Sequence, residues 1–511
     1  MIFQENNKNQ NKEMKQKKIY DVQDESSIES ESANGGWILK STPFVVCDIF
    51  LERYVTAGVL TILPLFLHLK LGLDQNTSTS IFHTFNSTML LFTIFGTIVA
   101  DTWFGLYASV VATSIIYVAG LGTVAMAMVD PLNLPIAVFI PLGLVIMMIG
   151  SGSLKNNLNA FGGAQHKLPE QKRQLERYFS VQYFGVKCGS FLTRLISPML
   201  RANVKCFGNH DCYSLSFGIF SGIMIFATLT FLIGSSQYKK IKPNGNMLVK
   251  VIKCVKNAIK QKSRSKQQPE LERKHWLDYA EDKHGKKLVL ETKAALKVIM
   301  ISLPVPIFWA CLMQQRSRWI FQGTKMNGDL GLYHLNADQM MVINSLLAII
   351  LIPLMDKFIY PILAKTGIKT MLERLIFGGV LIVIAFTLSL AVEIIIQHNY
   401  ISILWQIPQF VLIAIAEIFV YLSHLNFAYK EAPASMKPVM MSLLYLSMAG
   451  GDLIVVIVSA ISLFPSQAYE FSFFVCLTIL DIVVLIFLTR NYKHVDHELL
   501  NSLDTERLTK A

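Results

Sequence analysis

Long apolar segments alternate with short polar loops along most of this chain. A helix needs roughly 20 mainly apolar residues to cross the hydrocarbon core of a bilayer. Six candidate spans lie in the first half, at about 44–69, 80–100, 106–129, 134–152, 178–200 and 213–235. Six more follow, at about 295–320, 339–358, 371–393, 401–427, 438–462 and 468–490. The pattern predicts an all-α polytopic membrane protein with twelve transmembrane helices in two six-helix bundles.

A polar stretch, 236–292, separates the two sets of spans and has a helical pattern of its own. Lysines alternate with apolar side chains at helical spacing, at Met247, Leu248, Val251, Ile252, Val255 and Ile259. This spacing predicts an amphipathic helix. Two interpretations remain open: a helix lying on the inner membrane face, or a solvated helical spacer. The expected domains are a disordered tail (1–43), a first bundle (44–235), a basic linker (236–294), a second bundle (295–490) and a tail (491–511).

Composition and charge placement support a membrane protein and indicate its orientation. Hydrophobic residues make up 52% of the chain and charged residues 16%, which excludes an ordinary soluble domain. The stretch 236–292 carries fifteen Lys and Arg against six Asp and Glu, and the loop 153–177 is also basic. Because basic loops stay on the cytoplasmic side, both termini are expected in the cytoplasm. The net charge of +12 therefore reports topology, and no nucleic-acid partner is expected.

Two cysteines share a short loop that this topology places outside. Cys206 and Cys212 flank Phe-Gly-Asn-His-Asp between the fifth and sixth spans. An oxidising exterior makes a local disulfide the expected pairing. His210 and Asp211 have no further ligands at suitable spacing, so no metal site is expected there.

Ionisable residues inside the spans are the main functional signal. Glu52 and Arg53 are adjacent in the first span. A charge near the bilayer centre costs roughly 2.5–3.5 kcal/mol on insertion scales, so such residues usually have a partner and a use. The pair predicts a polar cavity between helices. The sequence shows no arrangement of a nucleophile and a base, so we expect neither an enzyme nor a cofactor.

Several motifs, taken in order, resemble the proton-coupled oligopeptide transporter (POT or PTR) family. The resemblance runs from about 44 to 490 and is closest to the animal di- and tripeptide transporters, although their large extracellular domain is reduced here to about Gln397–Tyr400. It rests on Glu52-Arg53, Ala100-Asp101-Thr102-Trp103-Phe104-Gly105, Tyr178-Phe179-Ser180, Gln314-Gln315-Arg316-Ser317-Arg318-Trp319 and Tyr429-Lys430-Glu431-Ala432-Pro433. It implies the major-facilitator fold, with a central cavity that opens to either side in turn.

The resemblance also assigns roles to individual residues. Arg53 would hold the peptide carboxylate, Glu417 would meet the peptide amine, and Glu52 would pair with Lys155. The alternative for the last pair is a purely structural ion pair. The remaining matches are the pocket residues Trp309, Asn344 and Gln315, and the proton-coupling histidine His83. For Trp309 the alternative is packing, and for His83 it is a neutral histidine hydrogen-bonded between helices.

The chain departs from the family pattern at charged positions. Ile49 and Met313 stand where the family has acids, Lys187 replaces a pocket asparagine, and Lys297 replaces an arginine. Coupling and gating are thus expected to involve His83, Glu52, Lys155 and Lys297, while Lys187 joins the substrate pocket. We expect Lys187 to need an acid partner, with Glu52 or Asp48 nearest by span order. Asp452 and Asp481 are further acids, in spans eleven and twelve.

These observations predict a secondary active transporter, a proton-coupled symporter of di- and tripeptides. The expected partners are a small peptide, protons and the lipid bilayer, for a monomer in the plasma membrane. One alternative is transport of another substrate, such as a modified peptide, an amino-acid derivative or an anion, because of Lys187. Another is a peptide sensor or scaffold that does not transport.

Overall fold

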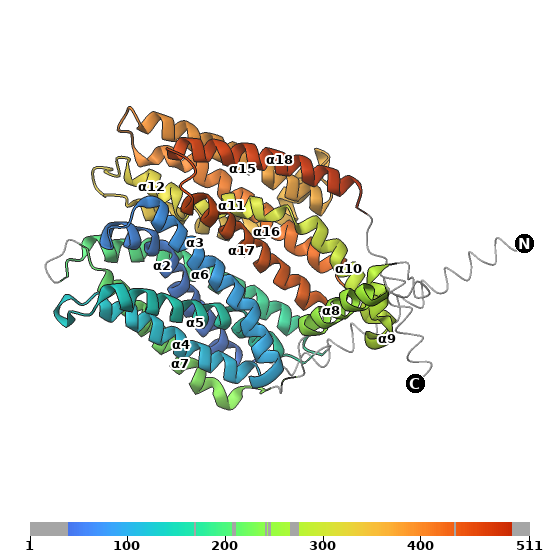
Figure 1. The fold of residues 1–511 in the computed structure, drawn as a ribbon. Coiled ribbons are helices and arrows are strands. Elements are labelled where there is room, and N and C mark those ends of the chain that lie inside the picture. The colour runs from blue at the N-terminus through green and yellow to red at the C-terminus, as the bar shows by residue number, and fades with distance from the viewer. Residues whose placement is uncertain are drawn as a thin grey trace, which may run out of the picture.

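The structure is a computed structural model that describes residues 39–167, 170–206, 211–240, 243, 247–265, 275–433 and 436–492. The predicted tails 1–43 and 491–511 therefore lie mostly outside the described residues. Two helical bundles lie side by side, and the axes of their helices are roughly aligned (Figure 1). Among the described residues there are two isolated β-bridges and no strand. The predicted all-α architecture is confirmed.

Six helices form the first bundle: α2 (Thr42–Leu65), α3 (Gln75–Val99), α4 (Leu106–Ala127), α5 (Ile136–Ala164), α6 (Lys172–Asn203) and α7 (Tyr213–Ile233). They surround one hydrophobic core, rich in the aromatic side chains of α7. Close packing of α3, α4 and α5 requires glycine at the contacts. A Cβ at Gly150 would lie 2.7 Å from the Cα of Tyr117, and one at Gly96 would lie 2.6 Å from the Cα of Ser153.

The second bundle contains shorter and more broken helices around a separate core. It comprises α10 (Lys286–Ser302), α11 (Val305–Gln314), α12 (Arg318–Thr324), α13 (Val342–Leu354), α14 (Tyr360–Lys365), α15 (Met371–Ile396), α16 (Ile407–Glu431), α17 (Lys437–Ala460) and α18 (Gln467–Arg490). The predicted seventh span, 295–320, is a bent unit of α10 with α11 and α12, turned by 49° at its break. Pro304 lies in that break, where proline interrupts helical hydrogen bonding.

Ten described helices are long and apolar enough to cross a membrane, and the bent pair makes eleven. The fifth predicted span, α6, is 32 residues long but is not among them. It carries Lys187, Arg194 and Arg201, which are largely covered by the protein interior. Charged and polar side chains together lower the mean hydropathy of α6, which still packs against α2 as the fifth helix of its bundle.

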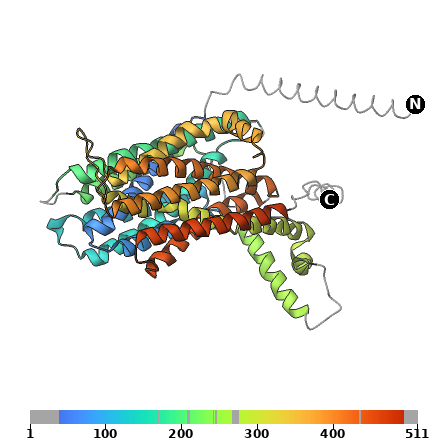
Figure 2. The same cartoon turned by 90° about the horizontal axis from the view of Figure 1, so that it is seen from above.

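The central linker forms a small helical unit at one end of the bundles. Helix α8 (Met247–Ser265) projects from the bundles (Figure 2) and packs against the short turn Trp276–Ala280, which leads into α9 (Glu281–His284). Cys254 and Ala258 of α8 are buried against Leu277 and Val289. The predicted amphipathic helix is confirmed. Protein covers part of the apolar face of α8.

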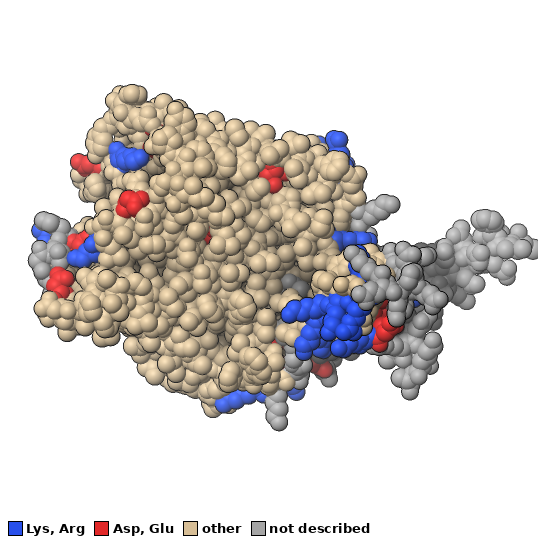
Figure 3. Space-filling view, viewed as in Figure 1, with Lys and Arg blue, Asp and Glu red and all other residues tan. Residues whose placement is uncertain are grey.

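Charged side chains gather at the two ends of the molecule on the face shown in Figure 3, and a broad band between them is nearly uncharged. One blue patch lies over α8, whose exposed lysines are Lys250, Lys253, Lys256 and Lys260. The opposite end carries the disulfide between Cys206 and Cys212, whose Cα atoms are 5.2 Å apart. The predicted disulfide is therefore present. We refer to these ends as the linker end and the disulfide end.

Candidate functional site

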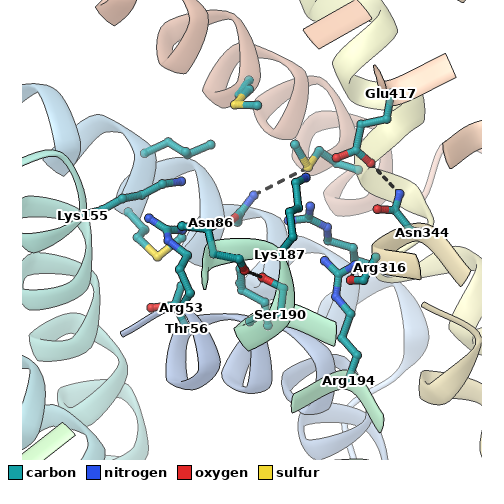
Figure 4. Close-up of a pocket in the computed structure, with 18 residues that line it drawn as sticks. Arg53, Thr56, Asn86, Lys155, Lys187, Ser190, Arg194, Arg316, Asn344 and Glu417 are labelled. Carbon is teal, nitrogen blue, oxygen red and sulfur yellow. Dashed lines mark hydrogen bonds between the residues drawn. The ribbon is translucent and has the colours of Figure 1, made fainter. Parts of the chain in front are cut away.

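A polar cavity lies between the two bundles, near the middle of their length. Its volume is about 160 Å³, and it continues into a wider space of about 490 Å³. The wider space reaches Asn156, Asn159 and Gln182, in the linker-end halves of α5 and α6. Figure 4 shows the polar residues of the inner cavity pointing toward one another. They are Arg53, Thr56, Asn86, Lys155, Lys187, Ser190, Arg194, Arg316, Asn344, Ser345 and Glu417.

Glu417 of α16 is held in place by two side-chain amides. Asn344 of α13 donates a hydrogen bond to it at 2.7 Å, and Gln315 donates another at 3.0 Å. Asn344 also donates to the side-chain oxygen of Gln315 at 3.1 Å. Asn344 lines the cavity, whereas Gln315 does not and acts through Glu417. The amides fix the carboxylate while leaving it free to bind a cation, because neither of them carries charge.

The predicted pair between Glu52 and Lys155 is not formed in this structure. Glu52 instead makes an ion pair with its neighbour Arg53, at 3.1 Å, and accepts a hydrogen bond from Thr56 at 2.9 Å. The ammonium of Lys155 lies 5.2 Å from the centre of the Tyr445 ring across the bundle interface. Arg53 lies close enough to compete for the carboxylate, since both groups sit on the same turn of α2.

The predicted acid partners of Lys187 are also wrong. In the described part of the chain Lys187 makes no ion pair with Asp48 or Glu52, and the acid with which it interacts electrostatically is Glu417. Its ammonium lies 5.6 Å from the centre of the Tyr183 ring. Helix α6 does pack against α2, as order along the chain suggested, but Lys187 lines the cavity together with Glu417 of α16. Asp48 itself is buried, and neither of its carboxylate oxygens has a hydrogen-bond partner among the described residues.

Two predicted residues lie outside the cavity. Trp309 is fully buried in the core of the second bundle, where its Cβ packs against Gly451, and it lines neither cavity. Packing is therefore the better interpretation of Trp309. Lys297 is exposed on α10 and lines neither cavity. The structure thus provides no contact between Lys297 and the site.

His83 lies in a buried cluster that joins the two bundles. Its Nδ1 is 2.6 Å from Oδ1 of Asp452, and its Nε2 is 2.8 Å from the Ser317 hydroxyl. Asn86 donates a hydrogen bond to the other oxygen of Asp452 at 2.7 Å. Met313, which replaces an acid of the family pattern, is 3.9 Å from the same Asn86 amide. Asp452 of α17 thus supplies a carboxylate in the cluster that Met313 adjoins.

Further contacts between the bundles gather toward the disulfide end. Arg201 pairs with Asp338 at 3.2 Å, and both side chains are buried. Arg318 pairs with Glu470 at 2.7 Å within the second bundle and donates to Asn76 of the first bundle at 2.8 Å. The bundles are therefore joined by buried polar contacts at the disulfide end, while the wider space extends toward the linker end.

Sequence reasoning missed two arginines of the cavity. Arg194 of α6 is buried and donates to the Ser345 hydroxyl at 2.8 Å. Arg316, between α11 and α12, interacts electrostatically with Glu417. A signal was present in Arg194, because a cation within a predicted span is itself an indication of function. Arg316 lies in the motif Gln314–Trp319, but whether its side chain points into the cavity depends on the break between α11 and α12.

Known proteins of the same kind share both sequence and fold with this chain. A family model described as PTR2, POT family, matches residues 107–494. Peptide transporter family 1 of Drosophila melanogaster is 38% identical over 354 residues, covering 69% of this chain and 47% of the relative. Solute carrier family 15 member 1 of Homo sapiens is 36% identical over 366 residues, covering 69% of this chain and 51% of the relative. The chain thus spans about half the length of these curated relatives.

Solved structures agree on the fold. The crystal structure of an auto-inhibited POT family peptide transporter has a TM-score of 0.76 and 24% identity, and covers 89% of this chain and 98% of its own. That of the POT family transporter PepTSo has a TM-score of 0.74 and 23% identity, with the same coverage. These likenesses bear out the predicted major-facilitator fold. With the family model matching most of the chain, they lead to one conclusion: this protein belongs to the POT family.

Proposed function

We propose that this protein transports di- and tripeptides by alternating access, together with protons. The observation that carries the proposal is a cavity between two bundles that holds opposite charges, with the cation Arg53 and the anion Glu417 both in its lining. A short peptide has a carboxylate at one end and an amine at the other. Arg53 offers two parallel donors to the carboxylate, and Glu417 offers a fixed charge to the amine.

The arrangement of contacts supports one state of such a cycle. Buried polar contacts close the disulfide end, and the wider space leads from the cavity toward the linker end. The basic linker and the basic patch on α8 support a cytoplasmic linker end. In this orientation the structure represents the state that faces the cytoplasm. The name of the Drosophila melanogaster relative, peptide transporter family 1, supports the same substrate class.

The proton route that fits the contacts runs through His83 and Asp452. An imidazole can bind and release a proton, and the His83 ring joins α3 of the first bundle to α17 of the second. The charge on His83 changes the strength of its contact with Asp452, and this contact must break when the disulfide end opens. In this chain the carboxylate partner comes from α17, not from the seventh span, where Met313 stands.

Uptake of a labelled dipeptide into proteoliposomes tests the proposal. Uptake driven by an inwardly directed proton gradient, and lost when the gradient is collapsed, is the expected result. Arg53→Gln is expected to lose uptake, whereas Lys365→Gln, a change at the exposed last residue of α14, is expected to keep it. Binding without uptake would instead indicate a sensor, and uptake that ignores the gradient would exclude proton coupling.

A further inference from the structure

The inner cavity carries more positive than negative charge. Among the described residues, five cationic side chains line it, namely Arg53, Lys155, Lys187, Arg194 and Arg316, and Glu417 is the one acid. Glu52 neutralises Arg53 from behind. A peptide with neutral side chains brings one carboxylate and one amine, so it adds no net charge. The excess of positive charge would remain uncompensated around such a substrate.

The excess does not depend on the lysines holding their protons. A guanidinium stays protonated at any physiological pH. Even with Lys155 and Lys187 neutral, the guanidiniums of Arg53, Arg194 and Arg316 would face only the carboxylates of Glu52 and Glu417. Opposite charges in a partly buried site attract far more strongly than in water. A further anion is therefore favoured in every protonation state of the two lysines.

The cations form two groups, one on either side of Lys187 (Figure 4). Arg53 and Lys155 lie on the side of α2 and α5, whereas Arg194 and Arg316 lie on the other side of Lys187 (Figure 4). The second group has unused hydrogen-bonding capacity. Arg194 is 8% exposed and its Nε has no partner among the described residues, and the same is true of Nε in Arg316. Buried donors without partners favour a ligand that can accept from them.

Lys187 lies between the two groups and has no carboxylate of its own. It contacts the Tyr183 ring, and in the described part of the chain it forms no ion pair. Glu417 interacts with Lys187 and Arg316 alike and accepts bonds from two amides. One carboxylate therefore cannot satisfy both these cations and a peptide amine.

We infer that the cavity prefers acidic peptides, with a second carboxylate bound by Lys187, Arg194 and Arg316. The terminal carboxylate binds Arg53 and Lys155, and the amine binds Glu417. This inference rests on the proposed peptide transport and narrows it to a substrate class. It assigns Lys187 to the selection of substrates rather than to a structural ion pair.

Competition between matched dipeptides tests the inference on the full chain in proteoliposomes. Ala-Glu and Ala-Gln differ in charge and hardly in shape, so the ratio of their inhibition constants reports the effect of the charge alone. We expect Ala-Glu to compete about tenfold better, which corresponds to roughly 1.4 kcal/mol. In the Lys187→Gln variant the advantage of Ala-Glu over Ala-Gln is expected to fall to about threefold or less. In the Lys187→Arg variant the advantage is expected to persist, because the positive charge is kept. The surface variant Lys365→Gln should leave the ratio unchanged.

The outcomes separate this inference from the function on which it rests. Equal competition by Ala-Glu and Ala-Gln in the unmodified protein overturns the preference and leaves peptide transport standing. A preference that survives Lys187→Gln unchanged overturns the role of Lys187. If neither dipeptide binds while glutarate, a simple dicarboxylate, does, the anion site stands and peptide transport fails. If none of the three compounds binds, both the preference for acidic peptides and the proposed peptide transport are wrong. Size-exclusion profiles and binding of Ala-Ala show whether the variants are folded.

Discussion

Asp452→Asn tests whether one buried carboxylate holds the disulfide end closed. Asp452 accepts from His83 at 2.6 Å and from Asn86 at 2.7 Å, and the side chains of Asp452 and His83 are fully buried. An asparagine can still accept from Asn86 through its one carbonyl oxygen, but its contact with His83 loses the negative charge, so no charge-assisted bond remains. A hydrogen bond to a charged group contributes about 1.5–3 kcal/mol.

That loss falls only on the closed state, because His83 and Asn86 belong to the first bundle and Asp452 to the second. The balance between closed and open disulfide ends should therefore move toward open by about 10- to 150-fold, at 1.4 kcal/mol for each factor of ten. The dependence of peptide uptake on the proton gradient should also become weaker in this variant, because a proton on His83 would no longer strengthen an ion pair.

The assay is labelling of a cysteine at Ser459, which is buried at the disulfide end and whose hydroxyl lies 2.8 Å from that of Ser80. Membrane-impermeant maleimide should label Ser459→Cys at least tenfold faster when Asp452→Asn is added, given the shift worked out above. The matched control is Asp481→Asn, another buried acid, on α18. Equal labelling rates in the two double variants would refute the reasoning.

Three further predictions concern other parts of the molecule. Glu417→Gln should raise KM for Ala-Ala uptake by about 10-fold or more, because the amine loses a fixed charge; an unchanged KM would remove Glu417 from the site. Arg201→Met should destabilise the protein by about 3–5 kcal/mol by leaving the buried Asp338 uncompensated, seen as a lower thermal midpoint that partly recovers with Asp338→Leu in the same chain. In the linker, burial and then Lys293 lower the pKa of His275, whose ring nitrogen accepts from the backbone of Leu277 at 3.2 Å. The stability this contributes is present above pH 6.5 and decreases as the pH falls below it. Hydrogen-exchange protection factors in 275–284, which are corrected for the intrinsic pH dependence of amide exchange, should therefore fall from pH 7 to pH 5, and unchanged protection factors would contradict this.

The sequence by itself determined the class of protein and its division into spans. Apolar length alone marks a segment that can cross a bilayer, since backbone hydrogen bonds within a helix need no outside partner. The cost of a charge inside a span made Arg53 and Glu417 candidates, and the resemblance to the POT family added Asn344. Cys206 and Cys212 were paired correctly because only six positions separate them.

Only the tertiary structure decided which charges meet. Glu52 pairs with Arg53 and not with Lys155, Lys187 faces Glu417, and His83 meets Asp452 from the other bundle. Each of these pairings depends on the rotation of a helix about its axis and on which helices are neighbours. Neither is encoded in the length or hydrophobicity of a span, because one residue turns a helix by about 100 degrees. The polar partners of a membrane cavity are therefore fixed by packing between helices, while the spans that carry them are fixed by their own sequence.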